Sequence, residues 1–303
     1  MDLNQFWVFY HVAKFKSFSL AADALFVTRP LISIRIRQLE ETYKIRLFER
    51  SGRKVELTNA GEVLFEYADR AFSIIKDANS HMEDMKGIRF GKLKISSGLT
   101  VGTYYLPPLL AAFQQKYPNI EIQMKVKNKK EVIDDILSFR DDLGFVGNME
   151  PVDNLVMTSL WKEELVVIVP PSHEFTELKT FPLSKLNEQP LILREKGSGT
   201  RELIEKKLRK EQISVRVVME LGSDEAIKRA VEVGLGMSIV PTGVVKKEVR
   251  RGLIKAIRIS KEKVLLTYSM IYHKDKYISH IIKAFINMAL EDSRPDPLCG
   301  KPY

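Results

Sequence analysis

The spacing of apolar residues changes twice along the chain. Over residues 1–45 they recur at steps of three and four, which predicts short amphipathic helices. Residues 59–88 keep that spacing through what should be one long helix. Residues 91–292 instead alternate short apolar runs, typical of strands, with amphipathic stretches typical of helices. We therefore expect three parts in chain order: a small helical head, a long helix and an α/β domain.

The head is predicted to contain three helices and a hairpin. The apolar stripe of the first helix is Leu3, Phe6, Tyr10 and Ala13. Ser19 is expected to cap a second helix over Leu20–Leu25, and Thr28 a third. The expected buried stripe of the third helix is Ile32, Ile36, Leu39 and Tyr43. A β-hairpin over residues 46–57, turning at Ser51-Gly52, completes the head.

The long helix, which Thr58 is expected to cap, carries an apolar seam. Its seam residues alternate between steps of four and three, which is typical of a coiled coil and predicts pairing with a second copy of the chain. The alternative is an ordinary helix whose seam lies on the globular core of its own chain. The residues expected in the dimer interface are Leu64, Tyr67, Ala71, Ile74 and Ala78.

From residue 91 onward the alternation predicts parallel sheets with helices on both faces. About two hundred residues of this pattern suit two lobes better than one sheet. The expected strands are Lys92–Ser97, Ile120–Lys127, Leu143–Gly147, Leu165–Val169, Leu191–Leu193, Val215–Leu221, Met237–Val240 and Val264–Tyr272. The expected helices are 102–116, 130–139, 200–210, 224–233 and 277–291.

Charge is unevenly distributed along the 303 residues. The chain has 48 basic and 39 acidic residues, a net charge of +9. Residues 28–54 hold eight basic and three acidic residues, a net +5, which is over half of that excess. Clustering of this kind indicates a polyanionic partner. A second basic run, Lys246 to Lys263, has eight basic and two acidic residues and fits a solvated helix face followed by an edge strand.

Two helices joined by a tight turn and followed by a basic hairpin form a winged helix-turn-helix, whose second helix enters the major groove of DNA. On its exposed face, Arg29 and Arg37 can bind guanine through two hydrogen bonds each, and Ile34 can contact a thymine methyl group. Basic residues of the hairpin would contact phosphates or the minor groove. The residues expected to bind double-stranded DNA are Ser19, Thr28, Arg29, Pro30, Ser33, Ile34, Arg35, Arg37, Arg50, Arg53 and Lys54.

The order of residues is more specific than this pattern. Ser17-Phe18-Ser19-Leu20-Ala21-Ala22, Leu47-Phe48-Glu49-Arg50 and Leu57-Thr58-Asn59-Ala60-Gly61 closely resemble the LysR-type transcriptional regulators. Residues 194–201 and 230–237 are similar to later segments of that family, and residues 100–110 to its branch that regulates carbon fixation and sulfur assimilation. Arg29 and Ile34 depart from the residues common at these places, which puts the operator sequence in doubt but not DNA binding.

The resemblance implies a multidomain α+β protein. A winged helix-turn-helix head would cover residues 1–58, a linker and dimerisation helix 59–90, and an effector-binding domain 91–303. That last domain is similar to type II periplasmic binding proteins, with lobe 1 at about 91–161 and 268–303 and lobe 2 at about 162–267. The implied function is a sequence-specific, ligand-responsive transcriptional regulator. It would assemble as a dimer or a dimer of dimers, with RNA polymerase as a further candidate partner.

Open α/β sheets bind ligands beyond the carboxyl ends of their strands. Here the segments after several predicted strands hold small hydroxyl residues at helix starts, where unpaired N–H groups favour anions. We therefore expect a small anionic metabolite between the lobes, although each of these residues alone could be a simple helix cap. The expected effector-binding residues are Ser97, Thr100, Gly102, Thr103, Asn148, Ser198, Gly199, Thr200 and Ser223.

The sequence offers little support for catalysis. The loop at Gly197-Ser198-Gly199-Thr200 lacks the lysine of a phosphate-binding P-loop, and the five histidines share no metal-ligand spacing. We therefore expect no enzyme activity, no cofactor and no metal. Cys299 is the only cysteine, and neither a membrane span nor a secretory signal is evident, so the expected location is the cytoplasm. The alternative function is a solute-binding protein of a transport system, which shares the two-lobed cleft.

Overall fold

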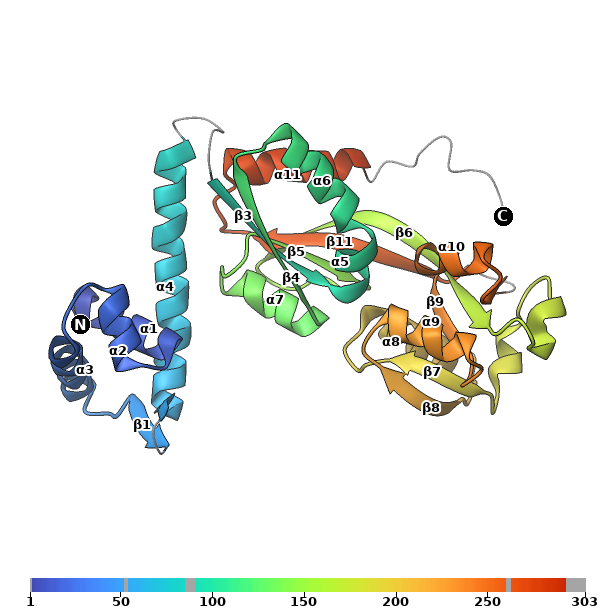
Figure 1. The fold of residues 1–303 in the computed structure, drawn as a ribbon, viewed down its shortest axis with the longest axis horizontal. Helices are drawn as coiled ribbons and strands as arrows, with labels where there is room; N and C mark the ends of the chain where they lie inside the picture. Colours follow the sequence, from blue (N-terminus) through green and yellow to red (C-terminus); the bar gives the residue numbers. More distant parts are fainter. Residues whose placement is uncertain (1, 52–53, 85–90, 260–262, 293–303) are drawn as a thin grey trace. The chain divides into compact units, whose positions relative to one another are not determined.

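The computed structural model describes residues 2–51, 54–84, 91–259 and 263–292. The chain divides into two compact units, which we call the N-terminal and the C-terminal unit (Figure 1). The N-terminal unit comprises Met1–Met82 and Ser138–Arg140, and the C-terminal unit comprises Glu83–Leu137 and Asp141–Tyr303. Cys299 and the rest of residues 293–303 lie outside the described part.

The N-terminal unit has the predicted order of elements. They are α1 (Leu3–Phe15), α2 (Phe18–Ala24), α3 (Arg29–Tyr43), β1 (Phe48–Ser51), β2 (Lys54–Leu57) and α4 (Asn59–Asp84). The expectation that Ser19 caps the second helix is wrong, because the helix begins earlier. The Ser17 Oγ accepts a hydrogen bond from the Leu20 backbone N–H at 3.2 Å, so Ser17 is the cap and Ser19 lies within the helix.

The core of this unit lies between α1, α2, α3 and one face of α4. From α1, Phe9 and Val12 are fully buried. From α3, Ile32, Ile36 and Leu39 are buried, which confirms the first three positions of the predicted stripe. Tyr43 is 41% exposed and contradicts the fourth position, because it is the last residue of α3, where the helix leaves the core.

Helix α4 begins as predicted, since the Thr58 Oγ1 accepts a hydrogen bond from the Gly61 N–H at 3.1 Å. A Cβ on Gly61 would lie 2.1 Å from the Leu47 carbonyl oxygen, so only glycine lets the helix approach the hairpin this closely. The residues of the predicted seam differ in their surroundings. Leu64 and Ala71 pack against the core of their own unit, whereas Tyr67, Ile74 and Ala78 are exposed.

The C-terminal unit contains a large sheet that two lobes share. The strands are β3 (Gly91–Gly98), β4 (Ile120–Lys127), β5 (Leu143–Gly147), β6 (Leu155–Val169), β7 (Pro190–Arg194), β8 (Arg216–Leu221), β9 (Ser238–Pro241), β10 (Lys255–Arg258) and β11 (Leu265–His273). The helices are α5 (Leu99–Tyr104), α6 (Leu106–Lys116), α7 (Lys129–Leu137), α8 (Gly199–Lys210), α9 (Asp224–Glu232), α10 (Thr242–Arg250) and α11 (His280–Asp292), with 3-10 turns η1 (Glu174–Glu177) and η2 (Leu183–Leu186).

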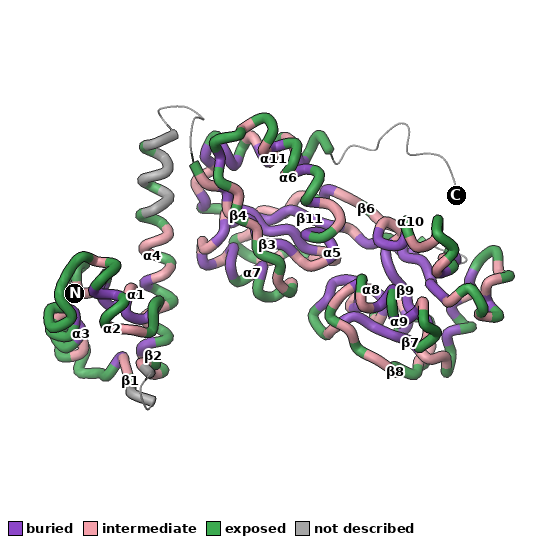
Figure 2. Tube along the Cα trace, in the orientation of Figure 1, coloured by how far each residue is buried: buried purple, intermediate pink, exposed green. Residues whose placement is uncertain are grey.

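The large sheet has the order β10-β6-β11-β5-β3-β4, and β9 also pairs with β6. The expectation of parallel sheets holds for β3 with β4 and β5, and for β7 with β8. It is wrong for β6 and β11, which run antiparallel to their neighbours because they carry the chain between the lobes. The buried traces in Figure 2 follow these central strands.

Two elements of the C-terminal unit show the largest departures from the sequence expectation. Strand β6 begins at Leu155 rather than Leu165, because residues 155–164 pair along β11 before residues 165–169 pair with β9 and β10. The helix expected over 102–116 is divided at Tyr105 into α5 and α6. Pro107 and Pro108 have no N–H with which to bond the carbonyls of the preceding turn, so the first helix ends before them.

Candidate functional site

The outward face of α3 presents basic and apolar side chains. Arg29, Ser33, Ile34 and Arg37 are all exposed, with Ile34 at 52%, and Pro30 between them is exposed as well. Within the described part of the chain, Arg29 and Arg37 have no ion pair. These cations are therefore free to contact DNA.

The remaining residues expected to bind DNA differ in their surroundings. Ser19 and Thr28 are exposed at the helix-turn-helix surface. Arg35 is only about one third exposed, and its Nη1 lies 3.3 Å from the Asp2 carboxylate at the start of α1. It therefore braces two helices rather than extending freely. Arg53 lies outside the described residues, as do the side chains of Arg50 and Lys54.

The turn between α2 and α3 carries a residue that sequence reasoning missed. Phe26 is 96% exposed and adopts a left-handed backbone conformation, with φ of 54°. Its N–H bonds the Asp23 carbonyl at 3.2 Å, which closes the turn and directs the ring outward. The apolar character of Phe26 predicts burial, so no local signal identifies this exposed aromatic side chain.

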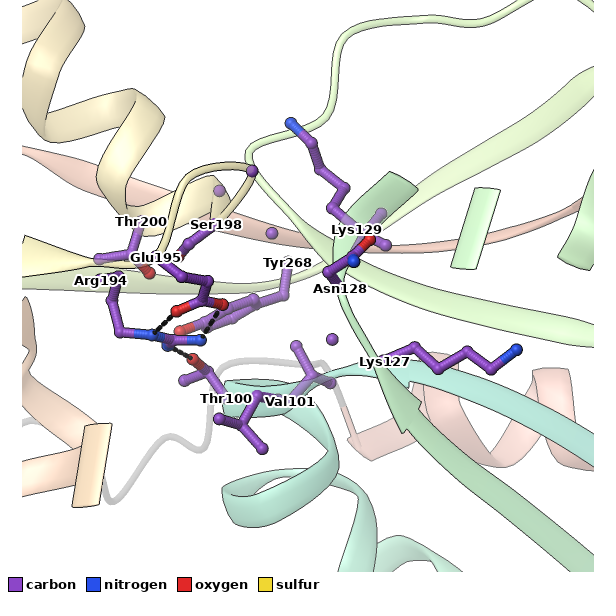
Figure 3. Close-up of a pocket in the computed structure, with 16 residues that line it drawn as sticks. Thr100, Val101, Lys127, Asn128, Lys129, Arg194, Glu195, Ser198, Thr200 and Tyr268 are labelled. Carbon is purple, nitrogen blue, oxygen red and sulfur yellow. Dashed lines mark hydrogen bonds and ion pairs between the residues drawn. The ribbon is translucent and has the colours of Figure 1, made fainter. Parts of the chain in front are cut away.

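The C-terminal unit contains a pocket at the carboxyl ends of its strands (Figure 3). Thr100 enters from the start of α5, Ser198 and Thr200 from the start of α8, and Lys129 from the segment that follows β4. The space that a water molecule can enter measures about 30 Å³, within a void of about 370 Å³ that includes the open mouth. A molecule larger than water therefore needs the lining segments to move apart.

One wall of the pocket is a buried ionic network centred on Arg194. Its guanidinium pairs with Glu195 at 2.8 and 2.9 Å and with Asp224 at 3.1 Å. The Thr100 hydroxyl donates to Asp224 at 2.6 Å and accepts from Arg194 at 3.1 Å. Burial lowers the pKa of Arg194, but the Asp224 and Glu195 carboxylates more than offset this, so its pKa lies above the usual value. Arg194 is a charged group already held by two carboxylates.

The opposite wall is formed by the start of α8 and by Lys129, the first residue of α7. The Ser198 side chain does not cap α8, so the first N–H groups of that helix face the pocket without a side-chain acceptor. A Cβ on Gly199 would lie 2.1 Å from the Gly147 carbonyl oxygen, so glycine is required where the two loops meet. Lys129 binds the Asn148 carbonyl at 3.3 Å and also pairs with Glu202.

Tyr268 forms the floor of this pocket from β11 and is only 2% exposed. Burial, assisted by the charges of Asp224 and Glu163, holds the pKa of Tyr268 well above its usual value. Its hydroxyl therefore stays protonated at all physiological pH values. A protonated phenol in this position can donate a hydrogen bond to a ligand.

The structure brings together only part of the predicted effector set. Thr100, Ser198, Gly199 and Thr200 line the pocket. Five others do not line it. Ser97 and Gly102 are buried elsewhere, Thr103 is exposed, and the Asn148 carbonyl accepts a hydrogen bond from Lys129. The Ser223 hydroxyl caps α9 by accepting from Ala226 N–H at 3.1 Å. For Ser223, the simple cap is what the structure shows.

Several pocket residues were missed from the sequence. Lys127 ends β4, a strand that was predicted with the correct bounds, and Asn128 and Lys129 follow it. Applying the carboxyl-end rule to that strand would have included them. Tyr268 had no such signal, because β11 runs antiparallel and contributes a mid-strand side chain.

Two observations apply to the residues that the structure describes. None of their helices is long and apolar enough to cross a membrane. No group of three or more His, Cys, Asp or Glu side chains among them is arranged to hold a metal ion.

Comparisons with known proteins cover nearly the whole chain. Residues 3–62 match the model of the bacterial regulatory helix-turn-helix protein, lysR family, and residues 87–294 match the LysR substrate binding domain. The HTH-type transcriptional activator CmpR of Synechocystis sp. is 32% identical, with 94% of this chain and 93% of CmpR aligned. A probable RuBisCO transcriptional regulator of Nostoc sp. is 31% identical, over 93% of this chain and 86% of its own length.

Solved structures agree with this match. Full-length CbnR complexed with its target DNA superposes with a TM-score of 0.71 at 25% identity, covering 96% of this chain and all of CbnR. The regulatory domain of Synechocystis CcmR, solved in complex with 2-PG, has a TM-score of 0.62 at 30% identity and covers 67% of this chain and 98% of its own. These matches favour a transcriptional regulator over a solute-binding protein of a transport system.

Proposed function

We propose that this chain, which belongs to the LysR family of transcriptional regulators, changes its binding to operator DNA when a small anion enters the pocket between Thr100 and the start of α8. One observation carries this proposal: the uncapped N-terminus of α8 and Thr100 line the same polar pocket of the C-terminal unit. The head would bind the major groove through the exposed face of α3.

The ligand class follows from the groups that remain available. Arg194 is already paired, so the first N–H groups of α8 and the hydroxyls of Ser198 and Thr200 would hold the anion, and Lys129 would join them only by leaving Glu202. A helix N-terminus binds phosphate or carboxylate oxygens through its N–H groups and dipole. The CcmR complex with 2-PG supports a small anionic metabolite of this kind.

Binding must also move the pocket walls, because the present space admits only about one water molecule. An anion that fits the opened pocket would shift the population towards that arrangement. A coupling of about 1–3 kcal/mol between ligand and operator is typical for such a switch.

We expect Thr100→Val to weaken the response to the effector about tenfold or more, since it removes a hydroxyl that contacts two charged groups. The measurement is fluorescence anisotropy of the full chain on DNA from upstream of its own gene, titrated with 2-PG. Thr103→Val is the matched control, because Thr103 is exposed and does not line the pocket. Equal responses from the two variants would place the ligand elsewhere.

We also propose that the chain self-associates through α4. Tyr67 and Ile74 are 63% and 54% exposed on that helix. We expect Tyr67→Asp combined with Ile74→Asp to shift the chain to monomers and abolish operator binding at working concentrations, since one head alone covers half a two-fold site. Sedimentation velocity reports the change. Leu3→Asp, at a 66% exposed apolar position on α1, is the control, and a monomeric wild type would refute the assembly.

The predicted organisation into 1–58, 59–90 and 91–303 stays a proposal, supported by family matches that span 3–62 and 87–294. A cytoplasmic location is likewise proposed, because the chromosomal operator is there.

A further inference from the structure

A second concave site lies in the C-terminal unit, away from the pocket at Thr100. It is bounded by β6, β10, α10 and the segment that follows η1, and its volume is about 500 Å³. Small-molecule sites in proteins usually measure about 300–1,000 Å³. The two sites share no lining residue.

The floor of this groove is apolar. Val166 and Val245 are 3% and 1% exposed and belong to the hydrophobic cluster beneath it. Val249 and Ala256 pack against the same cluster and also line the groove, together with Leu178. An aliphatic or aromatic body placed here would leave water for an apolar surface.

Four cations line the same groove: Lys179, Lys246, Lys255 and Arg258. Across the described ranges of the chain, none of the four has an ion pair. Two acidic residues also line it, but the Glu164 carboxylate already lies 3.8 Å from Lys263, which leaves Glu177 as the acid without an ion pair in those ranges. The groove therefore carries an excess of positive charge.

This arrangement also accounts for the second basic run of the sequence. As expected, Lys246 to Lys263 spans a helix and an edge strand, α10 and β10. The fold brings Lys246, Lys255 and Arg258 of that run to one concavity, where Lys179 joins them from a distant segment.

We propose that this groove binds a small amphiphilic carboxylate, with its apolar body on the valine floor and its carboxylate among the four cations. A fully polar anion would leave the floor unused, and an uncharged apolar molecule would leave the cations without a counterion. The site is independent of the effector pocket, so either can fail without the other.

The test is calorimetric titration of the full chain with hexanoate, octanoate and decanoate below their micellar concentrations, and with octanol. Affinity should rise by up to about fourfold for each added methylene group, because each buries further apolar surface. Octanol should bind at least fivefold more weakly than octanoate. Binding that is independent of chain length, or absent for every carboxylate, would overturn the proposal.

Variants locate the binding. Lys246→Gln with Lys255→Gln should weaken octanoate binding about fivefold or more. Lys247→Gln with Arg250→Gln removes the same amount of charge from α10 outside the groove and should leave octanoate binding unchanged. Ala256→Leu fills the floor without altering charge and should abolish decanoate binding. Equal losses of octanoate binding in both double variants would refute the site. Binding of a glutamate-rich peptide by a chain that does not bind decanoate would also refute it.

Discussion

The outward-facing residues of α3 all lie within one segment, Arg29–Arg37. The residues that line the pocket come from five separate segments of the chain. A surface of the first kind needs only one helix with its opposite face buried. A pocket of the second kind exists only when β3, β4, β5, β7 and β11 are all in place. The first is therefore robust to distant substitutions and the second is sensitive to them.

The arginines of the two regions also differ in their burial and in their ion pairs. Arg37 is exposed and has no ion pair in the described part of the chain, so it can change partners when DNA arrives. Arg194 is only 4% exposed and is held by Asp224 and Glu195. A buried cation of this kind stabilises one arrangement of its surroundings, and breaking its pairing is costly.

The largest expected difference between the two regions comes from replacing an arginine by methionine in each. Arg194→Met leaves Asp224, itself 1% exposed, without its counterion and should cost about 3–5 kcal/mol of unfolding free energy. Arg37→Met at an exposed site should change stability by less than about 0.5 kcal/mol. It should instead reduce discrimination between operator and unrelated DNA by about 1–3 kcal/mol.

Urea unfolding and competitive anisotropy measure these two effects. An Arg194→Met chain as stable as wild type would show that the network contributes nothing. Intact operator preference in Arg37→Met would remove Arg37 from the DNA-reading helix.

Two glycines allow packing in the two units to be compared, because each lies against a backbone carbonyl. Gly61→Ala and Gly199→Ala would each place a Cβ 2.1 Å from a carbonyl oxygen, in the N-terminal and the C-terminal unit respectively. Each should cost about 1–3 kcal/mol through overpacking. Differential scanning calorimetry should show one transition lowered in each variant. Gly222→Ala has nothing within 4 Å of its Cβ and should melt like wild type.

The smallest expected effect is a pH dependence confined to the N-terminal unit. Burial, with a further contribution from the Lys14 charge, lowers the pKa of His11 below its ordinary value of 6.5. The fold therefore favours the neutral imidazole, and this contribution is present above pH 6.5 and is lost as the pH falls through the lower, folded-state pKa. Acidification should thus lower the melting temperature of this unit.

Trp7 provides the readout, since its ring lies 4.4 Å from that of His11. In a Trp161→Phe background Trp7 is the only tryptophan, and its fluorescence can follow melting at pH 7.5 and 5.5. Adding His11→Phe should reduce the difference between the melting temperatures measured at these two pH values. An unchanged difference would assign the pH dependence to another group.

Sequence patterns predicted most of the N-terminal unit correctly, because its elements are short, sequential and capped by near neighbours. The tight turn between α2 and α3 was predicted, but the exposure of Phe26 within it was missed, since an exposed aromatic residue contradicts the usual preference. In the C-terminal unit the strands β4 and β5 were predicted with correct bounds, but the first ten residues of β6 were missed. Pairing with β11 stabilises those residues, and β11 lies about a hundred positions later in the chain.

Only local features were predictable from the sequence: the amphipathic faces, the cap at Thr58 and the basic surface of α3. Each depends on residues a few positions apart. Tertiary structure alone decided that Thr100 meets Asp224 across 124 positions and that Arg194 is already paired. Periodicity indicates which face of an element is buried, but not which other element covers that face. Ion pairs and pockets depend on the covering element, so they were not predictable from the sequence.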